Sequence, residues 1–297
     1  MKKWYIFCVL SVMIFALAAC SSEVVVDEQD VPAAQTGEQR VVAATSVVAN
    51  ILDLLEMDNV IAVPETSVPL PARYESLPTI GNAMNPDMET LAAMKPTDVI
   101  SVTTLQNDLE GPFKAINAPA TFMNLQSIEA MKRDILMLGD KYDRLTQAKK
   151  VTDALQAEID AAVATVPADA VKPKILILLG VPGSYLVATD QSYIGNITEL
   201  AGGENVMGDF NQEYLASNTE YLHEANPDII LRLAHGMPDE VIAMFDEEFQ
   251  TNDIWKHFNA VKNDRVYDLE EPLFATTANL DVAEAIAHLV NIFYEEE

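Results

Sequence analysis

The sequence predicts an α/β protein made of two lobes that are joined by one long helix. Three observations predict this class: short apolar runs alternate with helical patterns, one helical pattern is much longer than the others, and one helix–turn–strand unit occurs twice. Alternation of strands and helices is typical of parallel sheets that are covered by helices. A repeated unit on either side of a long helix indicates two lobes of similar construction.

The expected strands are short runs of apolar or β-branched residues, and we expect the fold to begin near Arg40. The first run, VVAATSVV, contains a strand and the turn after it, and the helical pattern VVANILDLLEM follows. The later runs are VIAVP, DVISVTT, KILILLGV, DIILRLA and RVYDL. KILILLG carries apolar residues on both of its faces, which is typical of a strand that is covered on both sides.

The longest helical pattern runs from about Asp140 to Thr165. Its apolar residues recur at steps of three and four, at Leu145, Ala148, Val151, Leu155, Ile159 and Ala162. These steps predict one helix, which Gly139 separates from the preceding pattern SIEAMKRDILML and which Pro167 ends. At 1.5 Å a residue, roughly 25 residues span nearly 40 Å, a length that suits a connection between two lobes.

The repeated unit is ETLAAMKPTDVI in the first half and EYLHEANPDIIL in the second. In each copy a glutamate, Glu89 or Glu220, stands seven residues before a proline that is followed by a strand pattern. Leu91 and Leu222 match as well. Such turns are common in α/β proteins, so chance is the alternative, but the long helix between the two copies favours a pseudo-symmetric protein.

The first twenty residues have the composition of an export signal. Two lysines precede an uncharged stretch from Trp4 to Ala19, which is shorter than the roughly 20 residues that a membrane-spanning helix needs. The stretch ends in Leu-Ala-Ala-Cys, which resembles the lipobox of bacterial lipoprotein signals. We therefore expect a signal peptide over residues 1–19, lipid attachment at Cys20, and a flexible acidic tether over residues 20–39.

Charge and motifs exclude several kinds of function. The chain has 18 basic and 46 acidic residues, a formal net charge of −28, which disfavours nucleic acid as a partner. The two cysteines, Cys8 and Cys20, belong to the leader and its end, so the exported domain is expected to be stable without disulfides. The sequence has no nucleophile elbow, phosphate-binding loop or zinc-protease motif, and we expect no enzyme.

Lipobox, tether, two α/β lobes and connecting helix together resemble the helical-backbone class of ABC-transporter substrate-binding proteins, which serves siderophores, cobalamin and heme. Three segments, TSVPLPARYESLPTIGNAMNPDME, SYIGNITELAGGENV and LRLAHGMPDE, are similar more narrowly to the heme-receptor lipoproteins of the iron-regulated surface determinant system. The resemblance covers the chain from about residue 40 to its end. It implies two Rossmann-like lobes with parallel sheets, over residues 40–139 and 167–297, joined by a rigid backbone helix over residues 140–166.

The resemblance implies that heme b is carried with its iron between Met84 of the first lobe and His235 of the second. His235 follows the predicted strand DIILRLA, and open α/β sheets bind ligands beyond the carboxyl ends of their strands. A methionine–histidine pair is an established way to hold heme iron. The alternatives are a loop histidine bonded to backbone, a gap-filling core methionine, and Met88 or Met237 as the sulfur ligand.

The two propionates of heme need hydrogen-bond donors in so acidic a protein. Thr45 and Ser46 lie where the first strand pattern turns into the first helix, and N–H groups at a helix start bind anions. An ordinary N-cap is the alternative role for either residue. Arg73 and Tyr74 are the nearest basic and phenolic candidates, and Tyr74 is also a candidate for contact with the porphyrin.

The wider class also implies partners at a membrane. In that class one acidic residue on each lobe pairs with arginines of the permease, and Glu89 and Glu220 match in the repeat; solvated helix charges are the alternative. The expected protein is a monomer, anchored through Cys20 on the extracellular face of the cell membrane, which delivers heme to an ABC permease and its ATPase. A surface heme-donor protein is a further expected partner, and a siderophore or cobalamin receptor is the alternative function.

Overall fold

The computed structural model describes residues 38–208, 210–217, 222, 225–235, 237–271 and 273–294. The predicted signal peptide, the lipidation site Cys20 and the tether up to residue 37 lie outside these ranges, and so does Glu220. Within the described ranges, no helix has both the length and the apolar character that a membrane span requires.

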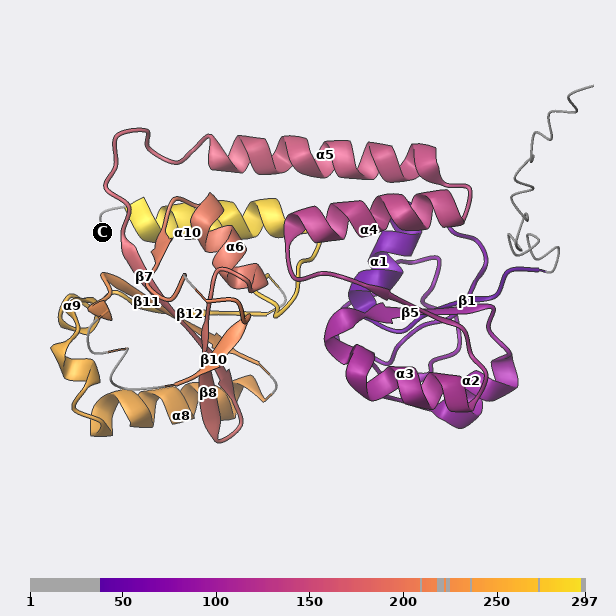
Figure 1. Ribbon diagram of the computed structural model, residues 1–297, viewed down its shortest axis with the longest axis horizontal. Coiled ribbons are helices and arrows are strands. Elements are labelled where there is room, and N and C mark those ends of the chain that lie inside the picture. The colour runs from indigo at the N-terminus through magenta and orange to yellow at the C-terminus, as the bar shows by residue number, and fades with distance from the viewer. Residues whose placement is uncertain are drawn as a thin grey trace, which may run out of the picture. The chain divides into compact units, whose positions relative to one another are not determined.

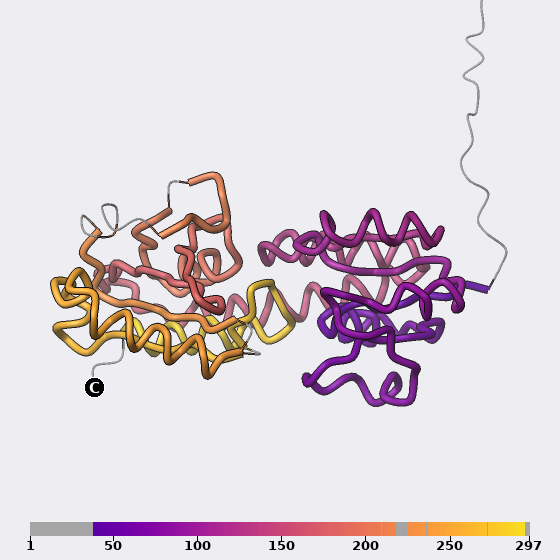
Figure 2. Tube along the Cα trace, turned by 90° about the horizontal axis from the view of Figure 1, so that it is seen from below, coloured from indigo at the N-terminus to yellow at the C-terminus, as the bar shows by residue number. Residues whose placement is uncertain are grey.

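Two sheets are each built from one half of the chain, as the colours in Figures 1 and 2 show. The first has the strand order β2-β1-β5-β6, and the second has the order β10-β8-β7-β11-β12 with β9 beside β7. The strands of the first sheet are β1 Val41–Ala43, β2 Val60–Ala62, β5 Asp98–Val102 and β6 Ala120–Met123. Those of the second are β7 Lys174–Val181, β8 Ser184–Ala188, β9 Glu204–Asn205, β10 Tyr214–Ala216, β11 Ile229–Ala234 and β12 Val266–Leu269.

The helices alternate with these strands, so the predicted α/β class is confirmed. In the first half they are α1 Ser46–Leu54, α2 Met88–Met94, the short η1 Thr103–Leu105, α3 Gln106–Ala115 and α4 Ile128–Lys141. They continue with α5 Leu145–Val163, α6 Tyr193–Leu200, α8 Pro238–Thr251, η2 Trp255–His257, α9 Asn259–Lys262 and α10 Val282–Tyr294. A two-stranded hairpin, β3 Gly81–Asn82 and β4 Asn85–Pro86, stands apart from both sheets.

The prediction of parallel sheets is correct for the first sheet and wrong for the second. All pairs in the first sheet are parallel, whereas β8 runs antiparallel to both β7 and β10. The cause is the short link Pro182–Gly183, in which Gly183 has the positive φ of 80°. A link this short joins antiparallel strands, because a parallel neighbour needs a crossover of a dozen or more residues.

Both faces of each sheet are covered, as the apolar character of the central strands predicts. In β1, Val41 and Ala43 belong to one core cluster and Val42 to another, because alternate residues of a strand point to opposite faces. β7 behaves in the same way: Ile175 and Ile177 pack with residues of α6 and α10, and Leu176 packs with residues of α8. The prediction that KILILLG is a strand covered on both sides is therefore confirmed.

The long helix is shorter than the sequence predicts. α5 begins at Leu145, whereas Asp140 belongs to α4, and the chain turns between Tyr142 and Arg144. The turn is made by Asp143, which adopts a left-handed conformation with φ 56°; aspartate tolerates this conformation better than most residues do. The 19 residues of α5 give a helix about 28 Å long at 1.5 Å a residue.

Gly139 does not break the helix, as the sequence suggested, but allows α4 and α5 to approach closely. The two helices run side by side (Figure 1), and a Cβ at Gly139 would lie 2.4 Å from the Cβ of Ala148 and 3.2 Å from the carbonyl oxygen of Arg144. Real Cβ atoms do not approach this closely, so the two helices would have to separate.

We therefore expect Gly139→Ala to destabilise the domain by about 1–3 kcal/mol, the usual cost of overpacking, in urea unfolding. Gly111→Ala is the matched control, because a Cβ at Gly111, which lies in α3, meets no atom within 4 Å. Alanine is the better helix former, so the control is expected to gain up to about 1 kcal/mol. Equal losses in both variants would contradict this account of Gly139.

The two copies of the repeated unit share detailed geometry, which supports the predicted internal repeat. Lys95 and Asn226, the residues before the two prolines, both have positive φ, and Leu91 and Leu222 are both fully buried. In each copy, the side chain of the residue after the proline accepts a hydrogen bond from a backbone N at or just before a strand. The backbone N of Arg40, just before β1, donates to Thr97 Oγ1 (2.9 Å), and that of Lys174, at the start of β7, donates to Asp228 Oδ2 (2.9 Å).

Candidate functional site

The start of α1 lies at the carboxyl end of β1, as predicted. Thr45 is the N-cap of α1, and its Oγ1 accepts a hydrogen bond from the N of Val48 (3.3 Å). Thr45 is buried, whereas Ser46, the first residue of the helix, is half-buried. The capping role that the sequence offered as the alternative for Thr45 is therefore confirmed, and the neighbouring N–H groups remain at the carboxyl edge of the sheet.

Met84 occupies the turn of the β3–β4 hairpin. The side chain of Asn82 shapes this turn, because its Oδ1 accepts hydrogen bonds from the N of Met84 (3.1 Å) and the N of Asn85 (2.9 Å). Gly81, with φ 80°, begins the hairpin. The Met84 side chain is 71% exposed, so the alternative role of a gap-filling core methionine is wrong for this residue.

His235 directly follows β11 and is held at the carboxyl edge of the second sheet. Its backbone N donates to the carbonyl oxygen of Gly180 in β7 (3.0 Å), which continues the pairing of the two strands. Its side chain is partly exposed, and Nδ1 lies 2.8 Å from Glu271 Oε1. The hydrogen bond to Glu271 fixes the orientation of the ring and leaves Nε2 as the nitrogen for other contacts.

The contact with Glu271 also changes the charge behaviour of the histidine. The hydrogen bond that the His235 ring donates to the Glu271 carboxylate raises the pKa of His235 above its usual value; partial burial opposes this effect, and the negative charge of Glu271 adds to it. Glu271 follows β12 at the same edge of the sheet, because β11 and β12 are parallel neighbours. The sequence analysis missed Glu271, although the run RVYDLEE shows two carboxylates just after a predicted strand.

Tyr74 and Arg73 do not lie where the sequence analysis expected them. Tyr74 is only 3% exposed, its hydroxyl donates to the carbonyl oxygen of Met57 (2.7 Å), and burial raises its pKa to about 12. Arg73 pairs with Asp53 (2.8 Å) and Asp58 (3.5 Å). Because Asp53 lies in the last turn of α1, Arg73 is at the opposite end of that helix from Thr45, and both residues are withdrawn as ligand contacts.

Of the two acidic residues predicted to dock onto the permease, Glu89 lies within the described ranges and Glu220 does not. Glu89 is exposed in the first turn of α2, where Asp87 caps the helix by accepting from the N of Glu89 and the N of Thr90 (3.0 Å each). A carboxylate in this turn also suits the helix dipole. Glu220 lies outside the described residues, so its match to Glu89 stays a prediction.

A cavity of about 420 Å³ lies beside the His235–Glu271 pair. Its lining combines the carboxylates of β12 and the loop after it with apolar and aromatic side chains: Asp268, Leu269, Glu270, Glu271, Leu273, Phe274 and His288. The ring of His288 packs edge-on against Phe274, with the ring centres 5.5 Å apart.

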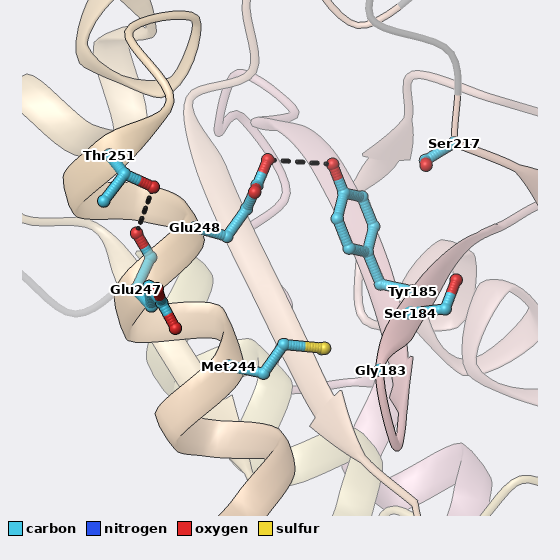
Figure 3. Close-up of a pocket in the computed structure, with 8 residues that line it drawn as sticks. All are labelled: Gly183, Ser184, Tyr185, Ser217, Met244, Glu247, Glu248 and Thr251. Carbon is cyan, nitrogen blue, oxygen red and sulfur yellow. Dashed lines mark hydrogen bonds between the residues drawn. The ribbon is translucent and has the colours of Figure 1, made fainter.

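A second cavity, of about 320 Å³, lies between β8 and α8 (Figure 3). Its central carboxylate, Glu248, accepts hydrogen bonds from the Tyr185 hydroxyl (3.4 Å), Asn252 Nδ2 (2.8 Å) and Trp255 Nε1 (3.1 Å). Burial and the charge of Glu248 raise the pKa of Tyr185. These bonds brace α8 against β8 and η2, and no residue singled out from the sequence lines this cavity.

Two sheets with covered faces and exposed side chains at their carboxyl edges are the arrangement in which open α/β proteins bind ligands. A family model described as periplasmic binding protein matches residues 41–273, and the chain belongs to this family. Because the family is one of binding proteins, its match agrees with the prediction that the chain is not an enzyme.

The particular relatives are more informative. Over 295 residues the chain is 43% identical to the high-affinity heme uptake system protein IsdE of Staphylococcus aureus strain Newman. The alignment covers 99% of this chain and 98% of that protein. The crystal structure of S. aureus IsdE complexed with heme superposes with a TM-score of 0.83 at 45% identity, over 87% of this chain and 100% of that one. An ABC transporter substrate-binding protein from Listeria monocytogenes EGD-e has a TM-score of 0.82 at 49% identity, over 87% and 99%.

Proposed function

We propose that this protein is the heme-binding receptor of an ABC transporter and delivers heme to a permease for iron uptake. The observation that carries the proposal is the similarity, over nearly the whole chain, to the heme uptake protein IsdE and to its heme-bound structure. Heme is the cargo in this proposal, and the protein binds and releases it without changing it. The local geometry of the candidate site residues adds support to the assignment.

In the proposed complex, Nε2 of His235 coordinates the heme iron from the second lobe. The support is the hydrogen bond between His235 Nδ1 and Glu271 (2.8 Å), since histidines that ligate metals commonly donate their other ring N–H to a carboxylate. Such a carboxylate orients the ring and raises its basicity as a ligand. Partial exposure of the His235 ring leaves it accessible to a ligand that approaches the carboxyl edge of the sheet.

The Met84 thioether is the proposed second axial ligand, from the first lobe. Three features support it over an ordinary core methionine: its high exposure, its place in a turn, and the Asn82 side chain that holds the turn in shape. A neutral sulfur ligand opposite a histidine also raises the reduction potential of heme iron. Met88, which is half-buried at the start of α2, is the less accessible alternative.

Charge determines where the propionates of the proposed ligand lie. The loop beside His235 carries Glu270 and Glu271, and α8 begins with Asp239 and Glu240, so this side of the site repels anions. The first turn of α1 carries no acidic residue and offers backbone N–H groups and the Ser46 hydroxyl. We therefore infer that the propionates point toward the Thr45–Ser46 turn.

The remaining parts of the proposal concern assembly. Residues 40–139 and 167–297 form the two lobes, and α5 connects them as a rigid helix; α5 packs against α1 and α4 of the first half and against α10 of the second. Glu89 and Glu220 dock the lobes onto the permease, which works with an ATPase. Cys20 carries the lipid that anchors a monomeric protein to the extracellular face of the membrane, where a surface protein donates heme.

The direct test is an absorption titration of residues 40–297 with hemin, with a ferric siderophore and cobalamin titrated in parallel. We expect a saturable Soret band at one hemin per protein and no displacement by an excess of the other two compounds. Tight binding of a siderophore or cobalamin, with only diffuse uptake of hemin, would favour the alternative function and end the heme proposal.

Glu271→Gln tests the role of the His235–Glu271 pair through pH. A protonated histidine cannot ligate iron, so coordination is lost as the pH falls through the raised pKa of His235. Removing the negative charge lowers that pKa, and the midpoint of the His235 titration in the ligand-free protein, followed by NMR, is expected to move to lower pH. For folding of the ligand-free domain the sign is opposite to that for coordination: the pair stabilises the fold at acid pH, and this contribution is lost as the pH rises through the raised pKa.

Glu270→Gln is the matched control for this measurement, because Glu270 is an exposed neighbour in the same loop. Its midpoint is expected to stay at the native value. At neutral pH the Glu271 variant is also expected to bind hemin about 10-fold to 100-fold more weakly, as is usual when the carboxylate partner of a ligating histidine is lost. An unchanged midpoint in Glu271→Gln would contradict the proposed role of this pair.

A further inference from the structure

Met237 has a backbone conformation that is unusual for its place at the start of a helix. It lies in the left-handed region, with φ 49° and ψ 59°, at the N-cap of α8. The other described non-glycine residues with positive φ all lie within two residues after the end of a helix, where a left-handed residue commonly satisfies the terminal carbonyl groups. These residues are Glu56, Lys95, Asn117, Asp143, Asn226 and Asp264.

Neither burial nor a side-chain cap offsets the cost of this conformation at Met237. The residue is 55% exposed, and its side chain makes no capping hydrogen bond to α8; only its carbonyl oxygen accepts from the N of Glu240 and the N of Val241 (3.1 Å each), as at any helix start. Asparagine and aspartate tolerate left-handed geometry because their short polar side chains bond locally, but methionine has no such group. Strained residues of this kind persist at ligand-binding sites, where the strain holds a side chain in a required place.

The neighbours of Met237 along the chain indicate what its side chain contacts. It lies two residues after His235, whose backbone is anchored to Gly180, and immediately before an α8 turn that carries Asp239 and Glu240. Met237 is therefore an exposed apolar side chain between a candidate iron ligand and an acidic helix start. An apolar group in such surroundings matches a flat apolar ligand, and methionine makes favourable contacts with aromatic rings.

We propose that Met237 is a positioning residue that packs against the macrocycle on the face coordinated by His235. This inference rests on the proposed function. Met237 contacts the ring and not the iron, because His235 takes the axial position on that face. Its side chain covers the ring edge near His235, excludes water from the iron–histidine bond and slows the release of heme.

Three variants test the proposal in the tether-less protein, residues 40–297, by the rate at which hemin is lost to an excess of a heme-scavenging protein. Met237→Ala and Met237→Gly remove the side chain, and both are expected to release hemin about 10-fold faster, in line with the loss of buried apolar contact. Met237→Leu keeps the apolar bulk and is expected to stay within about 2-fold of the native rate, with an unchanged Soret band.

Thermal unfolding of the ligand-free variants separates the side chain from the backbone. Glycine populates the left-handed region without a steric cost, so Met237→Gly is expected to melt about 2 °C or more above Met237→Ala although both lose hemin equally fast. Native release rates in both variants would overturn the proposal. A Met237→Leu spectrum that lacks an axial ligand would also overturn it, by making the sulfur an iron ligand.

The proposed function fails separately from this inference. If the native protein shows no saturable Soret band, heme binding itself is rejected and the role of Met237 falls with it. If the native protein binds hemin and His235→Ala does not, while the Met237 variants behave like the native protein, the proposed function stands and only the inference is rejected.

Discussion

Replacement of His235 by alanine is expected to weaken hemin binding by more than about 100-fold, because even carboxylates that support a ligating histidine are worth 10-fold to 100-fold. The loss follows from removing the proposed iron ligand, whose ring is oriented by the contact with Glu271. Isothermal or absorption titration of residues 40–297 measures it. The free energy of unfolding is expected to change by no more than about 0.5 kcal/mol, since the side chain is partly exposed on a loop.

His257→Ala is the matched control for this variant. His257 is exposed on η2, and the adjacent helix α9 bonds to Pro227, which precedes β11. His257 therefore lies near the amino end of β11, whereas His235 lies at its carboxyl end. The control is expected to bind hemin as the native protein does. Equal affinities of the His235 variant and the native protein would remove His235 from the site.

Replacement of Met84 by alanine is expected to convert bound ferric heme from six-coordinate low-spin to five-coordinate high-spin and to weaken binding about 10-fold, a loss of about 1.4 kcal/mol. The reduction potential is expected to fall, because a thioether ligand raises it. Folding is expected to be unaffected, since Met84 is 71% exposed at the tip of its hairpin. Absorption spectra and a spectroelectrochemical titration measure these changes.

Met84→Leu separates coordination from contact, because leucine keeps the apolar volume and lacks sulfur. It is expected to lose the six-coordinate spectrum as fully as Met84→Ala does while retaining more of the affinity. If both variants keep the native spectrum, Met84 is not a ligand, and Met88 on α2 becomes the residue to replace next.

The elements that could be predicted from sequence are those whose structure depends on a local pattern of apolar residues. Apart from Lys174 and Arg232, β7 and β11 are runs of apolar residues, as expected for strands with both faces buried, and such runs are visible without coordinates. β6 was missed because its sequence, Ala120–Met123, is short and half-exposed. β8 was missed because it depends on the two-residue link Pro182–Gly183, whereas strands of a parallel sheet are joined by long crossovers.

The limits of α5 could not be predicted, because the deciding residue is not a helix breaker. Asp143 ends the first helix through a left-handed conformation, while Gly139, the residue that the sequence offered as the break, is needed for helix contact. Helix propensity is a property of single residues, whereas the end of α4 and the role of Gly139 both depend on how α4 packs against α5.

In the candidate site, too, some residues could be predicted from the sequence and others depend on the three-dimensional structure. Met84 and His235 could be selected because the resemblance to the heme-receptor lipoproteins implies them, and the turn residues around one and the strand before the other agree with that resemblance. Tyr74 was placed wrongly because a tyrosine next to an arginine has no sequence mark that distinguishes a buried ring from an exposed one. Glu271 was missed because its role is a contact with a residue 36 positions away, and Met237 owes its interest to a backbone angle.

The most direct test of the central claim, that heme iron lies between Met84 and His235, is X-ray absorption at the iron edge of the hemin-loaded protein and its two alanine variants. The account predicts one sulfur and one axial nitrogen ligand in the native protein, no sulfur in Met84→Ala, and retained sulfur in whatever hemin His235→Ala still binds. A native spectrum without an iron–sulfur contribution, or one that persists in Met84→Ala, would contradict it.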